Sequence, residues 1–202
     1  MSYVSEAFDP VTFEHAKNIV LVPDQHNPNK FIEETDFFMN VLKTQNVISN
    51  TTNVLDFGCG MGRISNALIE TFECNVIGVD ISEKMKIFAS LYVSKPSKFK
   101  TSTTIEENFF DVCVAVFSLQ HVEDPETEIE KIFKGLRKNG IFVLLNEPSR
   151  MVPSGIDSEN FVIWDDDGFD VFHEVEKYAT KINSVPYAPN DGLAINFYKK
   201  HV

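Results

Sequence analysis

The residue pattern best suited to ligand chemistry lies at residues 54–63, which read Val-Leu-Asp-Phe-Gly-Cys-Gly-Met-Gly-Arg. A short apolar run ends in Asp56, and three glycines follow at alternate positions before the sequence turns helical. Because glycine has no Cβ and accepts positive φ, a ligand can come close to this backbone. The first turn of a helix also presents unpaired N–H groups. The pattern therefore predicts a strand, a tight ligand-binding loop and a helix.

The spacing of the glycines separates the ligand classes that use such a loop. A P-loop requires G-x-x-x-x-G-K-[ST], and no Lys-Ser or Lys-Thr follows here. A dinucleotide fingerprint, G-x-G-x-x-G, would place its last glycine where Arg63 stands, which disfavours an NAD-dependent enzyme. The observed acid followed by x-G-x-G-x-G resembles motif I of the class I S-adenosyl-L-methionine-dependent methyltransferases. The resemblance implies that Asp56 and the loop with Gly58, Cys59, Gly60 and Gly62 hold the cofactor's methionine end, and that Arg63 also binds the cofactor.

A second acid, Asp80, follows the apolar run 75–79. In nucleotide-binding α/β folds an acid at the end of the second strand can accept both ribose hydroxyls, because a carboxylate offers two acceptor oxygens to a diol. Ser82 can cap the next helix, which leaves Asp80 free for a ligand. Residues 78–82 resemble the corresponding methyltransferase motif, and this places Asp80 and Ile81 at the cofactor.

A third segment, 110–122, reads as a buried strand followed by Ser-Leu-Gln-His-Val. It resembles the fourth motif of small-molecule class I methyltransferases, in which the loop after the strand lines the methyl region and faces the acceptor. We therefore expect Phe117 and Ser118 at the cofactor. His121 is a candidate general base, since an unperturbed imidazole titrates near neutrality; the alternative is that it packs beneath the loop.

The third strand, expected near 98–101, departs from the family pattern. In the family an acid after this strand takes the adenine amino group, but here Thr101-Ser102-Thr103-Thr104-Ile105 follows. Either a hydroxyl or the backbone contacts adenine, or the pocket differs. Glu106 and Glu107 are possible substitutes.

Four further residues are candidates on the acceptor side. Glu147 ends the fifth strand at the ligand edge and is a candidate substrate contact. Trp164 and Phe161 form either an apolar wall over a substrate or part of the core. His173 is expected on a strand with a structural role.

Strands and helices alternate from residue 53 to 145, which predicts a parallel sheet covered on both faces. We expect strands at 53–57, 75–79, 110–117 and 141–145, with helices at 61–72, 83–93 and from Pro125, the last capped by Gly140. The resemblance implies an α/β, Rossmann-like, doubly wound and mostly parallel seven-stranded sheet with an antiparallel C-terminal strand.

The expected organisation is one methyltransferase domain over residues 1–202, with a cofactor-binding core at 51–146. Residues 1–50 contain a helix near 31–45, which either covers the pocket as a lid or packs on the flank of the sheet. Residues 147–202 are an irregular substrate-side segment. Its final strands are expected at 169–178 and 193–198, and 158–164 is a short helix or a strand.

Composition limits the remaining functions. A net charge of −12 over 202 residues argues against a large nucleic-acid footprint. No apolar stretch approaches membrane-helix length and no leader opens the chain, so we expect a cytoplasmic protein that does not bind a membrane. The cysteines lack metal-ligand spacing, so no metal is expected. The oligomeric state is left open.

These observations predict a methyltransferase that uses S-adenosyl-L-methionine and releases S-adenosyl-L-homocysteine. The acceptor is expected to be a small molecule with an O or N nucleophile, methylated by in-line displacement. The alternative is a catalytically degenerate regulatory or scaffold protein that binds S-adenosylmethionine or S-adenosylhomocysteine.

Overall fold

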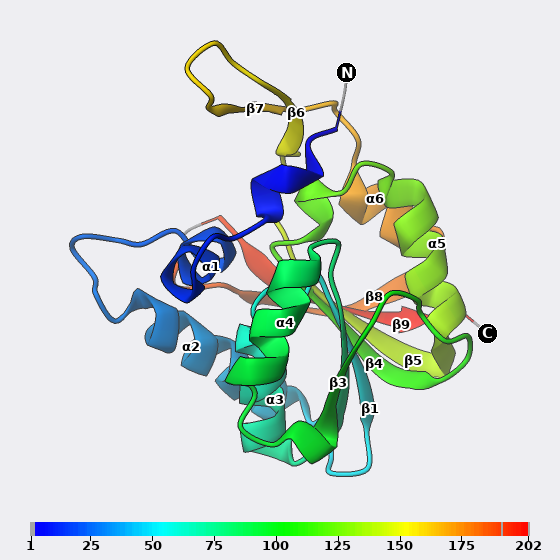
Figure 1. Ribbon diagram of the computed structural model, residues 1–202. Coiled ribbons are helices and arrows are strands. Elements are labelled where there is room, and N and C mark those ends of the chain that lie inside the picture. Colours follow the sequence, from blue (N-terminus) through cyan, green and yellow to red (C-terminus); the bar gives the residue numbers. More distant parts are fainter. Residues whose placement is uncertain (1–2, 191, 202) are drawn as a thin grey trace.

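The computed structural model describes residues 3–190 and 192–201, which form a seven-stranded sheet and a separate two-stranded hairpin (Figure 1). The large sheet has the order β3-β2-β1-β4-β5-β9-β8. Strand β9 runs antiparallel to both of its neighbours, whereas the pairs among β1 to β5 are parallel. This confirms the predicted mostly parallel sheet with an antiparallel C-terminal strand.

The strands follow the predicted apolar runs closely in the first half of the chain. Their bounds are β1 Asn53–Phe57, β2 Asn75–Val79, β3 Phe99–Ser102, β4 Phe110–Val116, β5 Leu136–Leu145, β6 Val152–Ile156, β7 Val162–Asp165, β8 Ala179–Pro186 and β9 Ala194–Lys200. Short 3-10 turns and α-helices connect them. These are η1 Ser5–Phe8, α1 Phe13–Val20, α2 Lys30–Gln45, α3 Arg63–Phe72, α4 Glu83–Tyr92, η2 Pro96–Lys98, η3 Leu119–His121, α5 Pro125–Gly135 and α6 Val171–Glu176.

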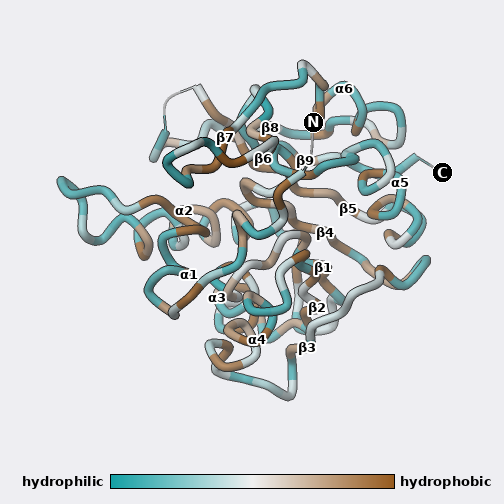
Figure 2. The backbone as a smooth tube through the Cα atoms, turned by 45° about the horizontal axis from the view of Figure 1, so that its top comes forward, coloured by the Kyte–Doolittle hydropathy of each residue, from teal (hydrophilic) through white to brown (hydrophobic). Residues whose placement is uncertain are grey.

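Two apolar layers enclose the sheet. One packs α2 and α3 on the sheet through residues such as Phe38, Leu42 and Leu68, and the other packs α5 and α6 through residues such as Ile132 and Val175. Figure 2 shows hydrophobic colour along the central strands β1, β4 and β5 and hydrophilic colour over most outer loops. Burial of these runs on both faces is what a parallel sheet requires. No helix in the described part of the chain is long and apolar enough to cross a membrane.

The N-terminal fifty residues divide into two parts with different roles. Helix α2 is a flank helix, because Phe38, Met39 and Leu42 on its inner face are buried in the core. The preceding residues instead line the cavity described below; they include Tyr3, Phe8 and Val20. Of the two alternatives for the helix near 31–45, the structure shows packing on the flank of the sheet.

The prediction of a strand at 169–178 is wrong. Residues Val171–Glu176 form helix α6, and the sixth strand of the sheet, β8, begins only at Ala179. The Asp170 side chain caps this helix by accepting a hydrogen bond from the backbone N–H of His173 at 3.0 Å. His173 therefore lies on a helix, not on a strand. A window this short has an apolar pattern that fits either period.

The helix cap predicted at Gly140 is also wrong. Helix α5 ends at Gly135, and β5 begins at Leu136. The left-handed residue near this point is Asn139, which lies within β5 with φ of 62°, and not the adjacent glycine. Asparagine tolerates this conformation better than most residues. At the other end of α5, Asp124 caps the helix by accepting a hydrogen bond from Thr127 N–H at 3.1 Å.

Residues 152–165 form a β-hairpin outside the main sheet. Strands β6 and β7 pair antiparallel, from Val152 opposite Asp165 to Ile156 opposite Val162. The segment 158–164, for which helix and strand both remained possible, thus contains a turn and strand β7. In Figure 1 the hairpin projects from the body next to the N-terminus.

Candidate functional site

A cavity of about 1100 Å³ opens at the carboxyl edge of the parallel strands. This is the edge where open α/β sheets bind ligands, at the point between β1 and β4 where the strand order reverses. All of the cofactor-binding candidates except Gly62 line the cavity, as do His121, Glu147 and Trp164. Glu106, Glu107, Phe161 and His173 do not line it.

The glycine loop after β1 touches the loop after β4. Gly58 has φ of +71°, and a Cβ built on it would lie 2.4 Å from the Cβ of Ser118. The Ser118 hydroxyl donates a hydrogen bond to the carbonyl of Phe57 at 2.9 Å. The loop is also fixed to β2, since the N–H groups of Gly58 and Cys59 both donate to Val79 O at 2.9 Å. Only glycine at position 58 allows this close approach.

Gly60 and Gly62 allow helices to approach the same loop. A Cβ on Gly60 would lie 2.4 Å from Val20 of α1, and one on Gly62 would lie 3.1 Å from Ala89 of α4. Both glycines have positive φ. Cys59 is 5% exposed within the loop, and burial raises the pKa of its thiol well above the ordinary value. Burial therefore favours the neutral thiol over the nucleophilic thiolate.

Asp56 ends β1 beneath the loop and is 2% exposed. Its carboxylate accepts a hydrogen bond from the Ser65 hydroxyl of α3 at 2.6 Å. Burial raises the pKa of Asp56 to about 6, against the opposing effects of Ser65 and Arg63. A carboxylate held in this way is suited to pair with a cationic group of a ligand in the cavity.

The burial of Asp56 predicts a pH-dependent cost to stability. Its pKa of about 6 in the folded protein exceeds the unfolded value, so the fold binds more protons and loses stability as pH rises through about 4 to 6. Asp56→Asn should therefore stabilise the protein without ligands by on the order of 2 kcal/mol at pH 8, with little effect at pH 4. Urea unfolding at both pH values measures the difference. An equal effect at both values would contradict the prediction.

Asp80 follows β2 and lies beside the glycine loop. It is half-buried, and its two carboxylate oxygens accept hydrogen bonds from Gly60 N–H at 2.8 Å and from Ser82 N–H at 2.9 Å. Burial raises the pKa of Asp80, while these two hydrogen bonds lower it. Ser82 caps α4 through Met85 N–H at 3.2 Å, as predicted, so the carboxylate of Asp80 is left facing the cavity.

Sequence reasoning missed a polar cluster beside the loop. Arg63 is 6% exposed and donates to the Thr35 hydroxyl at 3.0 Å, with its guanidinium 5.6 Å from the ring centre of Phe31. Nearby, the Tyr187 hydroxyl donates to the buried carboxylate of Glu34 at 2.7 Å. These contacts join α2, α3 and the segment before β9. No local sequence pattern predicts them, because the residues lie far apart in the chain. They leave Arg63 as a buried cation at the cavity wall.

The segment expected to contact adenine lines the cavity without a carboxylate. Residues 102–105 contribute hydroxyls and backbone, with the Ser102 hydroxyl donating to Thr104 O at 2.7 Å. Glu106 and Glu107 are exposed and outside the cavity, which removes them as substitutes for the missing acid. Ile81, 59% exposed, lies at the rim.

Phe117 begins the loop after β4 in a strained conformation, with φ of 53°. Its N–H donates to Leu145 O at 2.7 Å, and its ring packs edge-on against Tyr187. The positive φ directs the chain away from the sheet at the point where the cavity opens. Strain of this kind clusters at functional sites.

His121 ends the 3-10 turn after β4 and is half-buried. Its Nδ1 lies 2.8 Å from the carbonyl of Met151, so this nitrogen carries the proton and donates. Its Nε2 lies 3.3 Å from Nε2 of Gln120, from which it accepts. Burial lowers the pKa of His121, and the charge of Arg150 lowers it further. The imidazole is therefore neutral near pH 7, with both nitrogens held by the protein.

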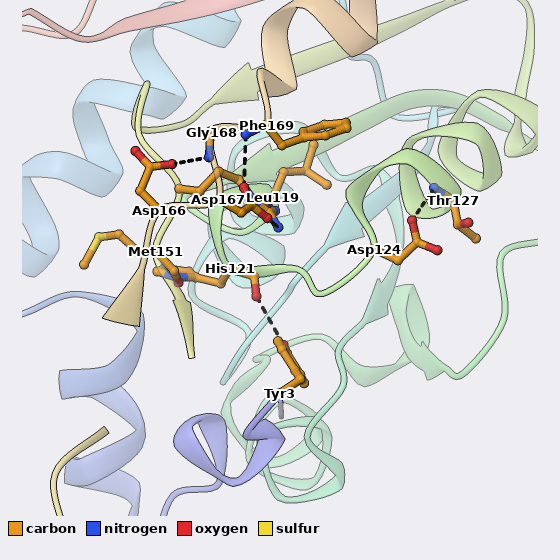
Figure 3. A network of polar contacts seen from close by, with 11 residues as sticks. Tyr3, Leu119, His121, Asp124, Thr127, Met151, Asp166, Asp167, Gly168 and Phe169 are labelled. Atoms are coloured by element: carbon orange, nitrogen blue, oxygen red, sulfur yellow. Dashed lines mark hydrogen bonds and ion pairs between the residues drawn. The ribbon is translucent and has the colours of Figure 1, made fainter. Parts of the chain in front are cut away.

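The hairpin is anchored to the loop after β4 by a polar network (Figure 3). Arg150, whose side chain is 1% exposed, donates to Leu119 O at 2.9 Å and pairs with the carboxylate of Asp167 at 3.0 Å. Met151 N–H donates to Gln120 O at 2.9 Å. The hairpin is thereby held beside the cavity.

Arg150→Ala should destabilise the protein by about 3 kcal/mol, because it removes buried charge-assisted hydrogen bonds. It should also speed proteolytic cleavage of the hairpin. Arg137→Ala is the matched control, since Arg137 pairs with Asp111 at the surface with 45% of its side chain exposed and should change the free energy of unfolding by under about 1 kcal/mol. Urea unfolding and limited proteolysis measure both effects, and equal costs would contradict the anchoring role.

Residues 3–9 cross the mouth of the cavity as a strap. At one end the Tyr3 hydroxyl donates to His121 O at 3.2 Å, and at the other Asp9 accepts from the Ser82 hydroxyl at 2.5 Å. Between these contacts η1 places Phe8 beside the hairpin. No three His, Cys, Asp or Glu side chains gather as a metal site within residues 3–190 and 192–201.

Comparisons with known proteins agree with this geometry. Residues 55–144 match the family described as "Methyltransferase domain". Phosphoethanolamine N-methyltransferase 1 of Triticum aestivum is 31% identical over 142 residues, which cover 66% of this chain and 28% of that protein. The chain thus spans less than a third of the length of that relative.

Solved structures share the fold at low identity. The PH0226 protein of Pyrococcus horikoshii OT3 has a TM-score of 0.65 at 19% identity, covering 91% of this chain and 95% of that one. An S-adenosylmethionine dependent methyltransferase from Mesorhizobium loti has a TM-score of 0.60 at 16% identity, covering 80% and 96%. Over residues 55–144 this chain therefore matches the methyltransferase domain family, and the solved structures share its fold. The predicted resemblance is confirmed.

Proposed function

We propose that this protein binds S-adenosyl-L-methionine in the cavity and transfers its methyl group to a nitrogen or oxygen of a small molecule. The observation that supports this most is the meeting of the glycine loop, Asp56 and Asp80 in one cavity that continues to His121 and Trp164. Its volume of about 1100 Å³ is at the upper end for small-molecule sites, which favours two ligands side by side.

The residues present fit the cofactor. The half-buried Asp80 carboxylate offers acceptors for the ribose hydroxyls. Asp56 would face the amino group of the methionine moiety, and the buried Arg63 would supply a cation for its carboxylate. Ser102 and Thr103 would lie against adenine in place of the missing acid.

When bound, the cofactor supplies a methyl group that its positively charged sulfur already activates. The task of the chain is then to align the acceptor with the methyl–sulfur axis and to exclude water. Phe117 and Ser118 would line the methyl region, and the strap at residues 3–9 would cover the mouth. His121 as a general base remains a prediction, and it requires Nε2 to exchange Gln120 for the acceptor.

One observation supports the second candidate function, a protein that binds the cofactor without turnover. Both nitrogens of His121 already have protein partners. Incubation with S-adenosylmethionine labelled in the methyl group separates the two functions. We expect labelled product from a panel of small amines and alcohols. Intact binding without label in any product would favour the degenerate protein and contradict the enzyme.

A further inference from the structure

The proposed methyl transfer can be taken one step further, to the chemical class of the acceptor. We propose that the acceptor is a small amine without a phosphate group, and that the Glu147 carboxylate binds its nitrogen beside the aromatic cluster of Phe8, His121 and Trp164. This inference rests on the proposed function and deepens it.

Among the buried and half-buried carboxylates that line the cavity in the described part of the chain, Glu147 is the one whose side chain has no partner. It follows β5, is half-buried and lines the cavity, and its N–H donates to Gln120 Oε1 at 2.8 Å. In the described part of the chain its carboxylate has no hydrogen-bond or ion-pair partner. The other buried and half-buried carboxylates of the lining do have partners: Asp56 with Ser65, Asp80 with two N–H groups, Glu34 with Tyr187, and Glu128 with Lys131.

A partly desolvated carboxylate without a partner favours a cationic ligand. The surrounding residues favour the same kind of ligand. Phe8 lies 5.5 Å from His121 and 6.0 Å from Trp164, between ring centres, and His121 lies 5.5 Å from Trp164. Gln120 joins this group to Glu147, because its amide bonds both His121 and the Glu147 backbone. Aromatic faces attract ammonium groups within about 6 Å.

In the part of the chain that the structure describes, a phosphate on the acceptor would find no free cation on this side of the cavity. The basic residues of the lining are Lys30, Arg63 and Lys131. The first two come from α2 and α3, beside the glycine loop, and Lys131 pairs with Glu128 at 2.6 Å. The nearby Arg150 is buried and paired with Asp167. A phosphate near Trp164 would therefore be repelled by the Glu147 carboxylate, with no nearby cation to offset the repulsion.

The chemistry of the step fits an amine. The bound ammonium first loses one proton to water. The lone pair of the resulting neutral nitrogen then forms the N–CH₃ bond while the S–CH₃ bond breaks and its electron pair returns to sulfur. The positive charge thus moves from sulfur to nitrogen, and any N–H proton then leaves to water. A carboxylate and aromatic faces beside the nitrogen stabilise the charge that develops there. An alcohol acceptor loses its proton and ends neutral, so it gains less from these groups.

Trp164 is the one tryptophan in the sequence, so intrinsic tryptophan fluorescence reports directly on binding beside Phe8, His121 and Trp164. Binding of S-adenosylhomocysteine to the full chain is first measured by calorimetry. The saturated complex is then titrated with benzylamine, benzyl alcohol, ethanolamine and phosphoethanolamine. We expect benzylamine to bind at least about tenfold more tightly than benzyl alcohol, as one charge-assisted contact would give, and ethanolamine to bind more tightly than phosphoethanolamine.

Glu147→Gln keeps the side-chain shape and the backbone hydrogen bond, and should remove the preference for benzylamine. Glu159→Gln makes the same change on the exposed turn of the hairpin and should preserve it. Tighter binding of phosphoethanolamine, no binding of either amine, or an unchanged preference in Glu147→Gln would overturn the inference. Failure of S-adenosylhomocysteine itself to bind would instead contradict the proposed function.

Discussion

Gly58→Ala is expected to destabilise the protein by roughly 3 kcal/mol and to abolish cofactor binding. The left-handed φ of +71° costs a non-glycine residue about 1–2 kcal/mol. The new Cβ would also lie 2.4 Å from the Cβ of Ser118, and relieving such overpacking costs typically about 1–3 kcal/mol more. Because Ser118 belongs to the loop after β4, the displacement would separate the two walls that meet at the methyl region.

Gly168 provides a matched control for this substitution. Its φ of +73° is nearly the same, but a Cβ there would meet nothing within 4 Å. Gly168→Ala should therefore cost only the backbone strain, about 1 kcal/mol, and should preserve S-adenosylhomocysteine binding. Urea unfolding and calorimetry measure both variants. If Gly58→Ala were no more harmful than Gly168→Ala, the close packing of the two loops would not matter for the site.

Asp80→Ala is expected to weaken S-adenosylhomocysteine binding by about a hundredfold or more. Two hydrogen bonds from ribose hydroxyls to a carboxylate contribute about 1.5–3 kcal/mol each, and about 1.4 kcal/mol is a factor of ten. The carboxylate also holds Gly60 N–H at 2.8 Å, so part of the loss could come from the loop itself. The ligand has to be changed as well in order to separate these effects.

A cycle with 2′-deoxyadenosylhomocysteine makes that separation. The protein with Asp80 intact should bind the deoxy ligand about tenfold more weakly than S-adenosylhomocysteine, because one hydrogen bond is missing. Asp80→Asn retains much of the loop's geometry and should show a smaller difference between the two ligands. An undiminished difference in Asp80→Asn would place the ribose elsewhere, whatever the loss of affinity in Asp80→Ala.

The parallel half of the fold follows from local sequence. Strands β1 and β2 occupy the predicted residues 53–57 and 75–79 because continuous apolar runs in a doubly covered sheet leave little choice of period or boundary. The glycine loop is equally local, since spacing alone excluded the P-loop and dinucleotide patterns. These elements are also where the methyltransferase family match lies.

The acceptor side could not be predicted in the same way, because distant segments build it. The tautomer of His121 depends on the backbone carbonyl of Met151, 30 positions away, and a carbonyl leaves no mark in a residue pattern. The pair of Glu34 and Tyr187 spans 153 positions. The strap at residues 3–9 reads as an irregular terminus in the sequence, and only the folded chain shows that it crosses the cavity.

The central claim is that the cavity at the carboxyl edge binds S-adenosylmethionine. Calorimetric titration of the full chain with S-adenosylhomocysteine, with NAD in parallel, tests it most directly. The account predicts one S-adenosylhomocysteine per chain, strongly weakened binding in Asp80→Ala, and no heat from NAD. Absence of S-adenosylhomocysteine binding to the folded chain, or tighter binding of NAD, would contradict it.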